Sequence, residues 1–374
     1  MSDRLAGRLA FFAVIASGLG RLAMQFLPKP WSAFGFIDIA QVLYGTPIFS
    51  THWPYWTFPF EYHPLIGWGS ALLSYVTGEL VVLVFVWLAA VALAARAVAV
   101  LLAARIGARR TIVFWSLAPQ LLLFGGQNFD ALAVLTVAYA AAALRADRPI
   151  RAGVSIAMGA ATKLFPLVAP PPYLVALWGV GKRRTALLLA GATIVALALI
   201  DGPAIIAPFS LLNYGVTPYA VATSNVDSIW LPVAMVLDLF VRPDQIGSIV
   251  TAISVGGLVI TYALLVLWPA LRSNPDAERL SWVAVAVLVF WTRLRSPQYA
   301  IWLLPVFALY VPDWRLLLFM FVGDAVTFLA IFGFRGTSRE VLGPEAMPFY
   351  AAIVAGVLIR QAAVAWLVIR ARAS

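Results

Sequence analysis

The sequence predicts an all-α, polytopic integral membrane protein with one transmembrane domain over residues 1–374, and two observations support this fold class. First, 63% of the residues are hydrophobic and only 11% are charged, whereas soluble domains contain about half apolar and about a quarter charged residues. Second, long apolar runs alternate with short clusters of Lys and Arg, and the mean hydropathy is +0.93. Because each span needs about 20 apolar residues, the chain has room for about ten to twelve helices.

The N-terminal segment predicts an uncleaved first span at about 9–27. Arg4 and Arg8 precede this span, and the positive-inside rule then places the N-terminus in the cytoplasm. The basic start and apolar run are also typical of a signal peptide, but Arg21 interrupts the region that follows and no A-x-A-type cleavage site is found there. We therefore expect the chain to emerge outside in a first external loop, 28–79.

The later apolar runs predict further spans and a second external loop, 201–246. The expected spans lie at about 80–104, 111–124, 129–144, 152–162, a sixth that ends at Lys182, 185–200, 247–271, a ninth that ends at 291–299, and three more before the C-terminus. The piece 231–243 is too short to span and predicts a re-entrant or surface helix. Two runs are short, 111–124 and 152–162, which predicts helices that break beside a cavity. With this threading both termini and most of the 26 Lys and Arg residues lie in the cytoplasm.

Polar residues from six separate parts of the chain fall at or near the outer ends of these spans. They are Asp38, Glu61, His63, Gln127, Asn128, Asp130, Lys163, Asn225, Asp227, Ser228, Arg293, Arg295 and Gln298. Polar and ionisable groups at such depth are costly and usually functional. Their convergence on one side predicts an extracytoplasmic site that is open to lipid.

The stretch 35–69 carries Asp38 and a mixture of acidic, aromatic and histidine residues. An irregular polar loop cannot lie in lipid, because its backbone groups need water or protein partners. Asp38 precedes IAQVLYGTP, which predicts a short helix, so its carboxylate could cap that helix. The alternative is that Asp38 is a general base that takes a proton from an attacking hydroxyl.

Further polar groups of this kind predict binding of a sugar or of its acceptor, each beside a structural alternative. Glu61 and His63 in EYHPL share one face of an extended segment, where they could bind sugar hydroxyls or belong to an aromatic interface belt. The turn GGQNFD (125–130) holds Gln127, Asn128 and Asp130 at a helix start, suited to hydroxyl or anion recognition or to simple capping. Asn225 and Asp227 in SNVDS, and Gln298 in RSPQY, complete this group, although SNVDS could be an ordinary external turn.

Three cations at outer helix ends predict a phosphate site. Lys163 lies among apolar residues, and Arg293 and Arg295 form an R-x-R pair. Snorkelling to lipid phosphates explains one isolated cation. Three of them could hold a phosphate by charge-assisted hydrogen bonds and stabilise charge on a leaving oxygen.

Several function classes are disfavoured by the composition. The net charge of +10 comes from clusters at span ends and forms no basic-aromatic patch, so we expect no nucleic-acid partner. The chain contains no Cys, which excludes disulfides and thiolate metal sites. Its two His residues lack tight ligand spacing, so we expect no cofactor or metal, with a divalent ion left as a weak alternative. A secondary transporter would need an internal repeat and polar groups on both halves, which we do not find.

The ordered motifs resemble those of the GT-C membrane glycosyltransferases. The closest likeness is to the polyprenyl-phosphate-mannose-dependent α-mannosyltransferases that build actinobacterial cell-envelope glycolipids. It rests on FIDIAQVLYGTPIF, EYHPL, GGQNFDALAVL, AGVSIAMGAATKLFPLV, SNVDS and RSPQYAIWLLP, in that order. The sequence departs from the family pattern at Tyr62-His63-Pro64-Leu65, where Y-x-P-P is usual, and in the R-x-R-S-P run, where some members carry a histidine.

The resemblance implies a fold, a reaction and partners. The fold would have about eleven to thirteen transmembrane helices, with short amphipathic helices in the first external loop. The reaction would be inverting transfer of mannose from a polyprenyl-phosphate donor to a glycolipid or lipid-linked glycan in the plasma membrane. Asp38 would be the base, and Lys163 with Arg293 or Arg295 would lie near the donor phosphate. A sibling enzyme that uses arabinofuranose or glucose is the alternative.

Overall fold

The computed structural model describes residues 2–29, 31–35, 37–44, 46–51, 53–216, 227–272, 275–336 and 347–373. Every named element within these ranges is helical, and the β pairing described there is one isolated bridge between Pro54 and Phe58. The predicted all-α class is therefore confirmed.

Six helices in the described part of the chain are long and apolar enough to cross a membrane. They are α1 (Asp3–Met24), α5 (Leu80–Ile106), α11 (Arg183–Ile200), α15 (Pro243–Tyr262) with its continuation to Ala270, α19 (Trp314–Gly336) and α20 (Met347–Ala373). They establish a polytopic membrane protein. The expected count of about eleven to thirteen spans stays a prediction, because the other helices are too short to qualify by length alone.

The two runs that were expected to break do so. The expected span 111–124 is divided into α6 (Ala108–Thr111), the π-helical turn η2 (Ile112–Ser116) and α7 (Pro119–Phe124). Pro119 begins α7 because a proline has no N–H to continue the preceding hydrogen-bond pattern. The helix α8 (Asp130–Arg145) follows, and α9 (Pro149–Ala160) ends before the short helix η3 (Phe165–Val168) and α10 (Pro170–Gly179).

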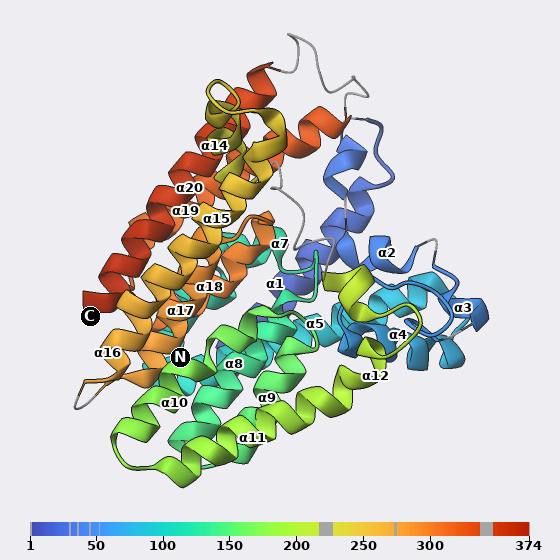
Figure 1. Cartoon of the computed structure of the whole chain (residues 1–374). Coiled ribbons are helices and arrows are strands. Elements are labelled where there is room, and N and C mark those ends of the chain that lie inside the picture. Colours follow the sequence, from blue (N-terminus) through green and yellow to red (C-terminus); the bar gives the residue numbers. More distant parts are fainter. Residues whose placement is uncertain are drawn as a thin grey trace.

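The first loop contains short helices, as expected. These are η1 (Trp31–Gly35), α2 (Asp38–Leu43), α3 (Ile48–Thr51) and α4 (Pro64–Val76). The buried Tyr55 organises this region: its hydroxyl donates to the carbonyl of Tyr62, and its backbone oxygen accepts from the N–H of Phe209 at 2.8 Å. In Figure 1 the helices α2, α3, α4 and α12 (Gly202–Ile205) lie together at the right, whereas both chain ends lie at the lower left.

The C-terminal half packs around two buried helices. The helix α17 (Ala277–Trp291) leads through η6 (Pro297–Tyr299) into α18 (Ala300–Leu309), and α18 is buried from Ala300 to Ala308. The helix α18 contacts α5, α7, α8 and η2, so it joins the two halves of the chain. The short helix α14 (Trp230–Leu237) occupies the piece predicted to be too short to span.

The helices α19 and α20 pack closely at two glycines. A Cβ atom on Gly323 would lie 2.7 Å from the oxygen of Gly356, and one on Gly356 would lie 2.8 Å from the nitrogen of Thr327. Real Cβ atoms do not approach other atoms so closely, so glycine is required at this crossing. The close crossing places Arg360 of α20 beside α19, where a Cβ atom on Gly323 would lie 2.7 Å from the nitrogen of Arg360.

Candidate functional site

The turn before α8 is fixed against α1 by glycine. A Cβ atom on Gly126 would lie 2.3 Å from the nitrogen of Gly18, so only glycine fits there. The N–H of Gly126 donates to the Ser17 hydroxyl at 3.2 Å. This contact sets the position of Asp130, which begins α8 and is only 1% exposed.

Asp130 accepts hydrogen bonds from two distant parts of the chain. Its Oδ1 atom lies 2.8 Å from Lys163 Nζ and 2.5 Å from Trp302 Nε1. The side chains of Lys163 and Asp130 are 13% and 1% exposed, so this is a buried ion pair. Asp130 Oδ2 is also buried and accepts no hydrogen bond from the residues that the structure describes. One carboxylate oxygen, Oδ1, thus joins separate parts of the chain. The other, Oδ2, can still accept a hydrogen bond from a hydroxyl group.

Aromatic rings form the wall behind Lys163. Trp302 stacks between Phe165 and Tyr299, with ring centroids 4.0 Å and 3.9 Å away. Lys163 Nζ lies 5.2 Å from the Tyr299 centroid and 5.6 Å from that of Trp302. A cation at this distance is stabilised by the electrons of the ring faces. The ammonium group is therefore held by one carboxylate and two rings.

The first loop meets this cluster through backbone and side-chain bonds. Asn128 Nδ2 donates to the Tyr62 hydroxyl at 3.0 Å, and the N–H of Leu65 donates to the carbonyl of Ala161 at 2.8 Å. Burial, and then the positive charge of Lys163, lowers the pKa of His63 to about 4. His63 is therefore neutral at pH 7, and its Nδ1 atom is buried without a hydrogen bond. We name the set His63, Gln127, Asn128, Asp130, Lys163 and Trp302 the lysine cluster.

The backbone next to Asp38 contacts the lysine cluster. Asp38 is the first residue of α2, and the N–H of the next residue, Ile39, donates to the carbonyl of Gln127 at 3.4 Å. Ile37 holds the N-cap position of α2, and Asp38 is the first helical residue. The Asp38 side chain lies outside the described part of the structure, so both of its predicted roles, helix cap and base, stay predictions.

A second buried cluster lies where η6 meets α19 and α20. Arg360 Nη2 donates to the carbonyl of Asp227, and Arg360 Nη1 lies 3.7 Å from Asp324 Oδ1. Arg295 Nη1 donates to Gln361 Oε1 at 3.1 Å. Burial and the charge of Arg360 lower the pKa of Arg295 to about 9, against the opposing effect of Asp324 and Asp227. We name the set Asp227, Arg295, Asp324, Arg360 and Gln361 the arginine cluster.

Tyr299 lies between the two clusters. Its ring contacts Lys163, and it interacts electrostatically with Arg295. The segment 292–299 thus contributes to both clusters, and Gln298 within it is 3% exposed. Two of the three predicted phosphate ligands, Lys163 and Arg295, therefore both interact with Tyr299.

The remaining predicted residues lie apart or outside the described residues. Arg293 Nη1 donates to the Thr251 hydroxyl of α15 at 2.6 Å, so it turns away from Arg295. Glu61 is exposed. Asn225 lies outside the described residues. The two clusters thus contain eleven residues, and four of them were not among the predicted site residues: Trp302, Asp324, Arg360 and Gln361.

Sequence reasoning missed the residues that complete both clusters. Asp324, Arg360 and Gln361 belong to no motif, although an acid and a base within apolar helices are themselves a functional signal. Arg21 was also missed: it is 4% exposed and donates to the carbonyls of Leu123 at 2.8 Å and Phe34 at 3.3 Å. It joins η1 to α7 and so fixes the entry to the first loop.

Neither cluster has the composition of a metal centre. Among the described residues, no group of three or more His, Asp or Glu side chains could hold a metal ion. Both clusters pair carboxylates with Lys or Arg, which competes with any cation. The arrangement suits hydroxyl groups and an anion.

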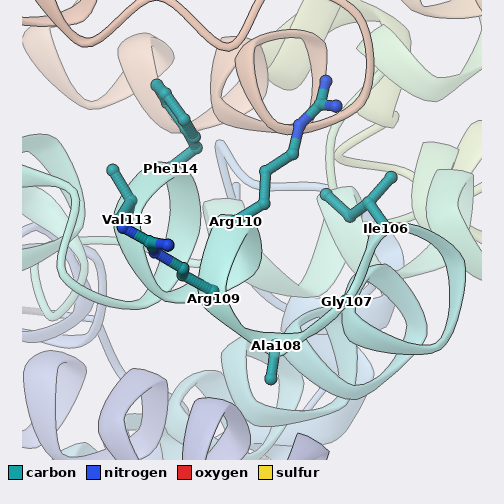
Figure 2. A pocket seen from close by; sticks show the side chains of 7 residues that line it. All are labelled: Ile106, Gly107, Ala108, Arg109, Arg110, Val113 and Phe114. Atoms are coloured by element: carbon teal, nitrogen blue, oxygen red, sulfur yellow. The ribbon is translucent and has the colours of Figure 1, made fainter. Parts of the chain in front are cut away.

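One surface hollow lies well away from both clusters, at the turn between α5 and α6 (Figure 2). It has a volume of about 450 Å³ and is lined by residues 106–110, 113 and 114. Gly107 makes the turn with φ of +84°, a conformation that favours glycine. Arg110 and Phe114 extend to the same side of the helical turn. This basic turn is typical of a membrane surface rather than of an active site.

Comparison with known families gives one match. The model of glycosyltransferase family 87 matches residues 60–297. No curated protein matches the chain significantly. The matched region includes His63, the GGQNFD turn, Lys163, Asp227 and Arg295, whereas Asp38, Trp302, Asp324 and Arg360 lie outside it.

Proposed function

The chain belongs to glycosyltransferase family 87, and from this premise we propose that it transfers mannose, with inversion, from polyprenyl-phosphate-mannose to a glycolipid or lipid-linked glycan. The observation that carries the proposal is the junction of the first loop with the lysine cluster. The proposal is supported by the hydrogen bond from Ile39 N–H, next to Asp38, to the carbonyl of Gln127, which lies in the turn that leads to the Asp130–Lys163 pair. In this proposal, separate segments of the chain supply the base, the cation and the hydroxyl-binding groups of one site.

In the proposed reaction, Asp38 accepts the proton of the acceptor hydroxyl. The hydroxyl oxygen attacks the anomeric carbon from the face opposite the phosphate, and a new carbon–oxygen bond forms. The bond between the anomeric carbon and the phosphate oxygen breaks, and the polyprenyl phosphate leaves with the electron pair. The phosphate is a stable anion, so the leaving group needs no general acid.

Lys163 and Arg295 bind the donor phosphate in this proposal. Lys163 is already paired with Asp130, but an ammonium group has three donors, and those not used by Asp130 can reach a phosphate oxygen. Arg295 also interacts with Tyr299. Charge-assisted bonds from both cations would stabilise the charge that develops on the leaving oxygen. We assign Arg293 no part, because it bonds to Thr251.

The acceptor side is formed by neutral groups. His63, with its pKa lowered to about 4, offers one donor and one acceptor at pH 7. Asn128, Gln127 and Asp130 Oδ2 offer further partners for sugar hydroxyls. A site with paired charges and neutral donors suits a polyol, which carries no charge of its own.

We place the site on the extracytoplasmic face of the plasma membrane. Figure 1 shows the first-loop helices on the side opposite both chain ends. The side of the termini also carries ionic contacts between helix ends, Arg145 with Glu278 at 2.5 Å and Arg370 with Asp313 at 2.7 Å. Basic residues at that side support a cytoplasmic location for it. Family membership also favours a transferase over the secondary transporter considered from the sequence.

The test is transfer from radiolabelled polyprenyl-phosphate-mannose to membrane glycolipids by purified protein. We expect Asp38→Asn to lose transfer while it still folds and binds the donor. Asp244→Asn is the matched control, because this exposed acid of α15 pairs only with the neighbouring Arg242 in the described part of the chain. Full activity of Asp38→Asn would refute its role as the base. Transfer from the arabinofuranose or glucose donor but not from the mannose donor would refute the sugar assignment alone.

A further inference from the structure

An apolar groove runs along α5, α8 and α9, and none of the residues of the two clusters lines it. Its volume is about 890 Å³. Leu93 and Val100 of α5, Leu135 of α8, and Val154 and Met158 of α9 line it. Two arginines also line it, Arg96 from α5 and Arg151 from α9. The groove is therefore apolar along its length, with a positive charge on each of two walls.

Both arginines lie near the level of the helix ends on the side of the termini. Arg151 is the third residue of α9. Arg96 contacts the start of α1, because a Cβ atom on Gly7, the fifth residue of α1, would lie 3.1 Å from Arg96 Cγ. At about 1.5 Å per residue, both positions lie within about 6 Å of the starts of α9 and α1.

The start of α9 is on the same side as the chain ends. Arg145, the last residue of α8, pairs with Glu278 near the start of α17. The helix α17 follows α16 (Trp268–Ala270), which lies near the C-terminus in Figure 1. The mouth of the groove therefore opens at one membrane surface, where lipid head groups lie.

Neither arginine has a carboxylate partner in the described part of the chain. One exposed arginine near a helix end is explained by snorkelling. Two unpaired arginines that face the same apolar groove from opposite walls are complementary to a group that is anionic at one end and apolar beyond it. Basic pockets between transmembrane helices bind anionic lipid head groups for this reason.

We propose that this groove binds an anionic phospholipid of the leaflet on the side of the termini. The phosphate binds Arg96 and Arg151, and one acyl chain extends along α8, between α5 and α9, toward Leu135 and Met158. The polyprenyl donor is a poorer fit, because its phosphate is needed near Asp130, at the opposite end of α8. The 16 residues of α8 separate the two ends by about 24 Å.

The bound acyl chain would end close to the lysine cluster. Leu135 lies five residues after Asp130, about 7.5 Å along α8, and Met158 lies near the end of α9, which stops three residues before Lys163. The helices α8 and α9 also touch here, where the Ser155 hydroxyl donates to the carbonyl of Thr136 at 2.9 Å. The lipid would fill the groove beside this contact and support α8, which begins with Asp130, and α9, which leads to Lys163.

The test is native mass spectrometry of the purified full-length protein in micelles that contain equal amounts of phosphatidylglycerol and phosphatidylcholine. We expect the wild type to retain phosphatidylglycerol preferentially. An arginine near a lipid surface contributes about a fivefold gain in anionic-lipid affinity, so Arg96→Gln with Arg151→Gln should lower retention about 25-fold. The control is Arg272→Gln, which removes an exposed arginine at the same end of the molecule.

Folding of each variant is checked by its unfolding temperature in phosphatidylcholine alone. As a second route, Val154→Trp should block the groove and lower the retention of phosphatidylglycerol while both arginines remain. Equal retention of the two lipids by the wild type would overturn the proposal, as would unchanged retention in the double variant. Displacement of phosphatidylglycerol by polyprenyl phosphate at equal concentration would also overturn it and assign the groove to the donor chain.

Discussion

The lysine cluster and the arginine cluster are both buried and ionic, but their hydrogen bonding differs. Asp130 receives Lys163 and Trp302 on one oxygen at 2.8 Å and 2.5 Å. No described residue makes a hydrogen bond of ordinary length to either carboxylate oxygen of Asp324, and Asp324 Oδ1 lies 3.7 Å from Arg360 Nη1. The first carboxylate is therefore fixed by direct bonds, whereas the second is held mainly by the electrostatic field of two arginines.

The two clusters therefore use buried charge in different ways. A short, directly bonded pair fixes geometry, and the lysine cluster joins α8, η3 and α18 in one arrangement. A longer pair leaves donors and acceptors without partners, which is costly in a low-dielectric interior. The close crossing of α19 and α20 at Gly323 and Gly356 offsets this cost. It keeps Asp324 and Arg360 near each other without a direct hydrogen bond between them.

The largest expected effect comes from breaking the lysine cluster. Asp130→Ala should lower the free energy of unfolding by about 3–5 kcal/mol, because it leaves the Lys163 ammonium buried without its carboxylate. Denaturant unfolding in detergent measures this. The double variant Asp130→Ala with Lys163→Met should recover much of the loss, since no unpaired charge remains. A double variant that is no more stable than Asp130→Ala would contradict the role given to the ion pair.

A smaller effect is expected in the arginine cluster. Asp324→Asn should lower the free energy of unfolding by about 1–3 kcal/mol, the range for a group that interacts with a charge. The loss should be smaller than for Asp130→Asn, because Asp324 forms no short bond. The two variants are compared by the same unfolding measurement. If Asp324→Asn costs more than Asp130→Asn, the proposed ranking of the two clusters is reversed.

The smallest effect is a pH dependence that arises from His63. Its pKa is about 4 in the folded protein and 6.5 in the unfolded chain, so the unfolded state binds more protons between these values. Stability should therefore fall as the pH is lowered from about 6.5 to about 4. Unfolding temperatures across this window measure the effect, and His63→Asn should reduce the slope.

A second group works in the opposite direction and serves as the control. Burial raises the pKa of Asp201 to about 6 from 3.8, so the folded state binds more protons there and stability falls as the pH rises through that window. Asp201→Asn should therefore steepen the loss of stability toward low pH. A His63→Asn variant with the wild-type slope would show that His63 does not titrate as described.

The sequence predicted the lysine cluster better than the arginine cluster for a physical reason. Asp130 and Lys163 both lie at helix ends, so counting spans is enough to place them on one side. Their ion pair still required the register of α8 against α9, which no local pattern contains. Asp324 and Arg360 lie in the middle of long apolar helices, where their contact depends on the glycine crossing. The helical class followed from composition alone, whereas the short first-loop helices were implied by the family resemblance.

The buried helix α18 has a consequence for how the protein is made. Its ten residues extend about 15 Å, half of the thickness of the hydrocarbon core. It is therefore too short to enter the bilayer as an independent segment during synthesis. It must instead pack against α5, α7 and α8. These three helices are synthesised more than 150 residues before α18. Trp302 on this helix completes the lysine cluster, so this cluster would be assembled only after most of the chain has been inserted.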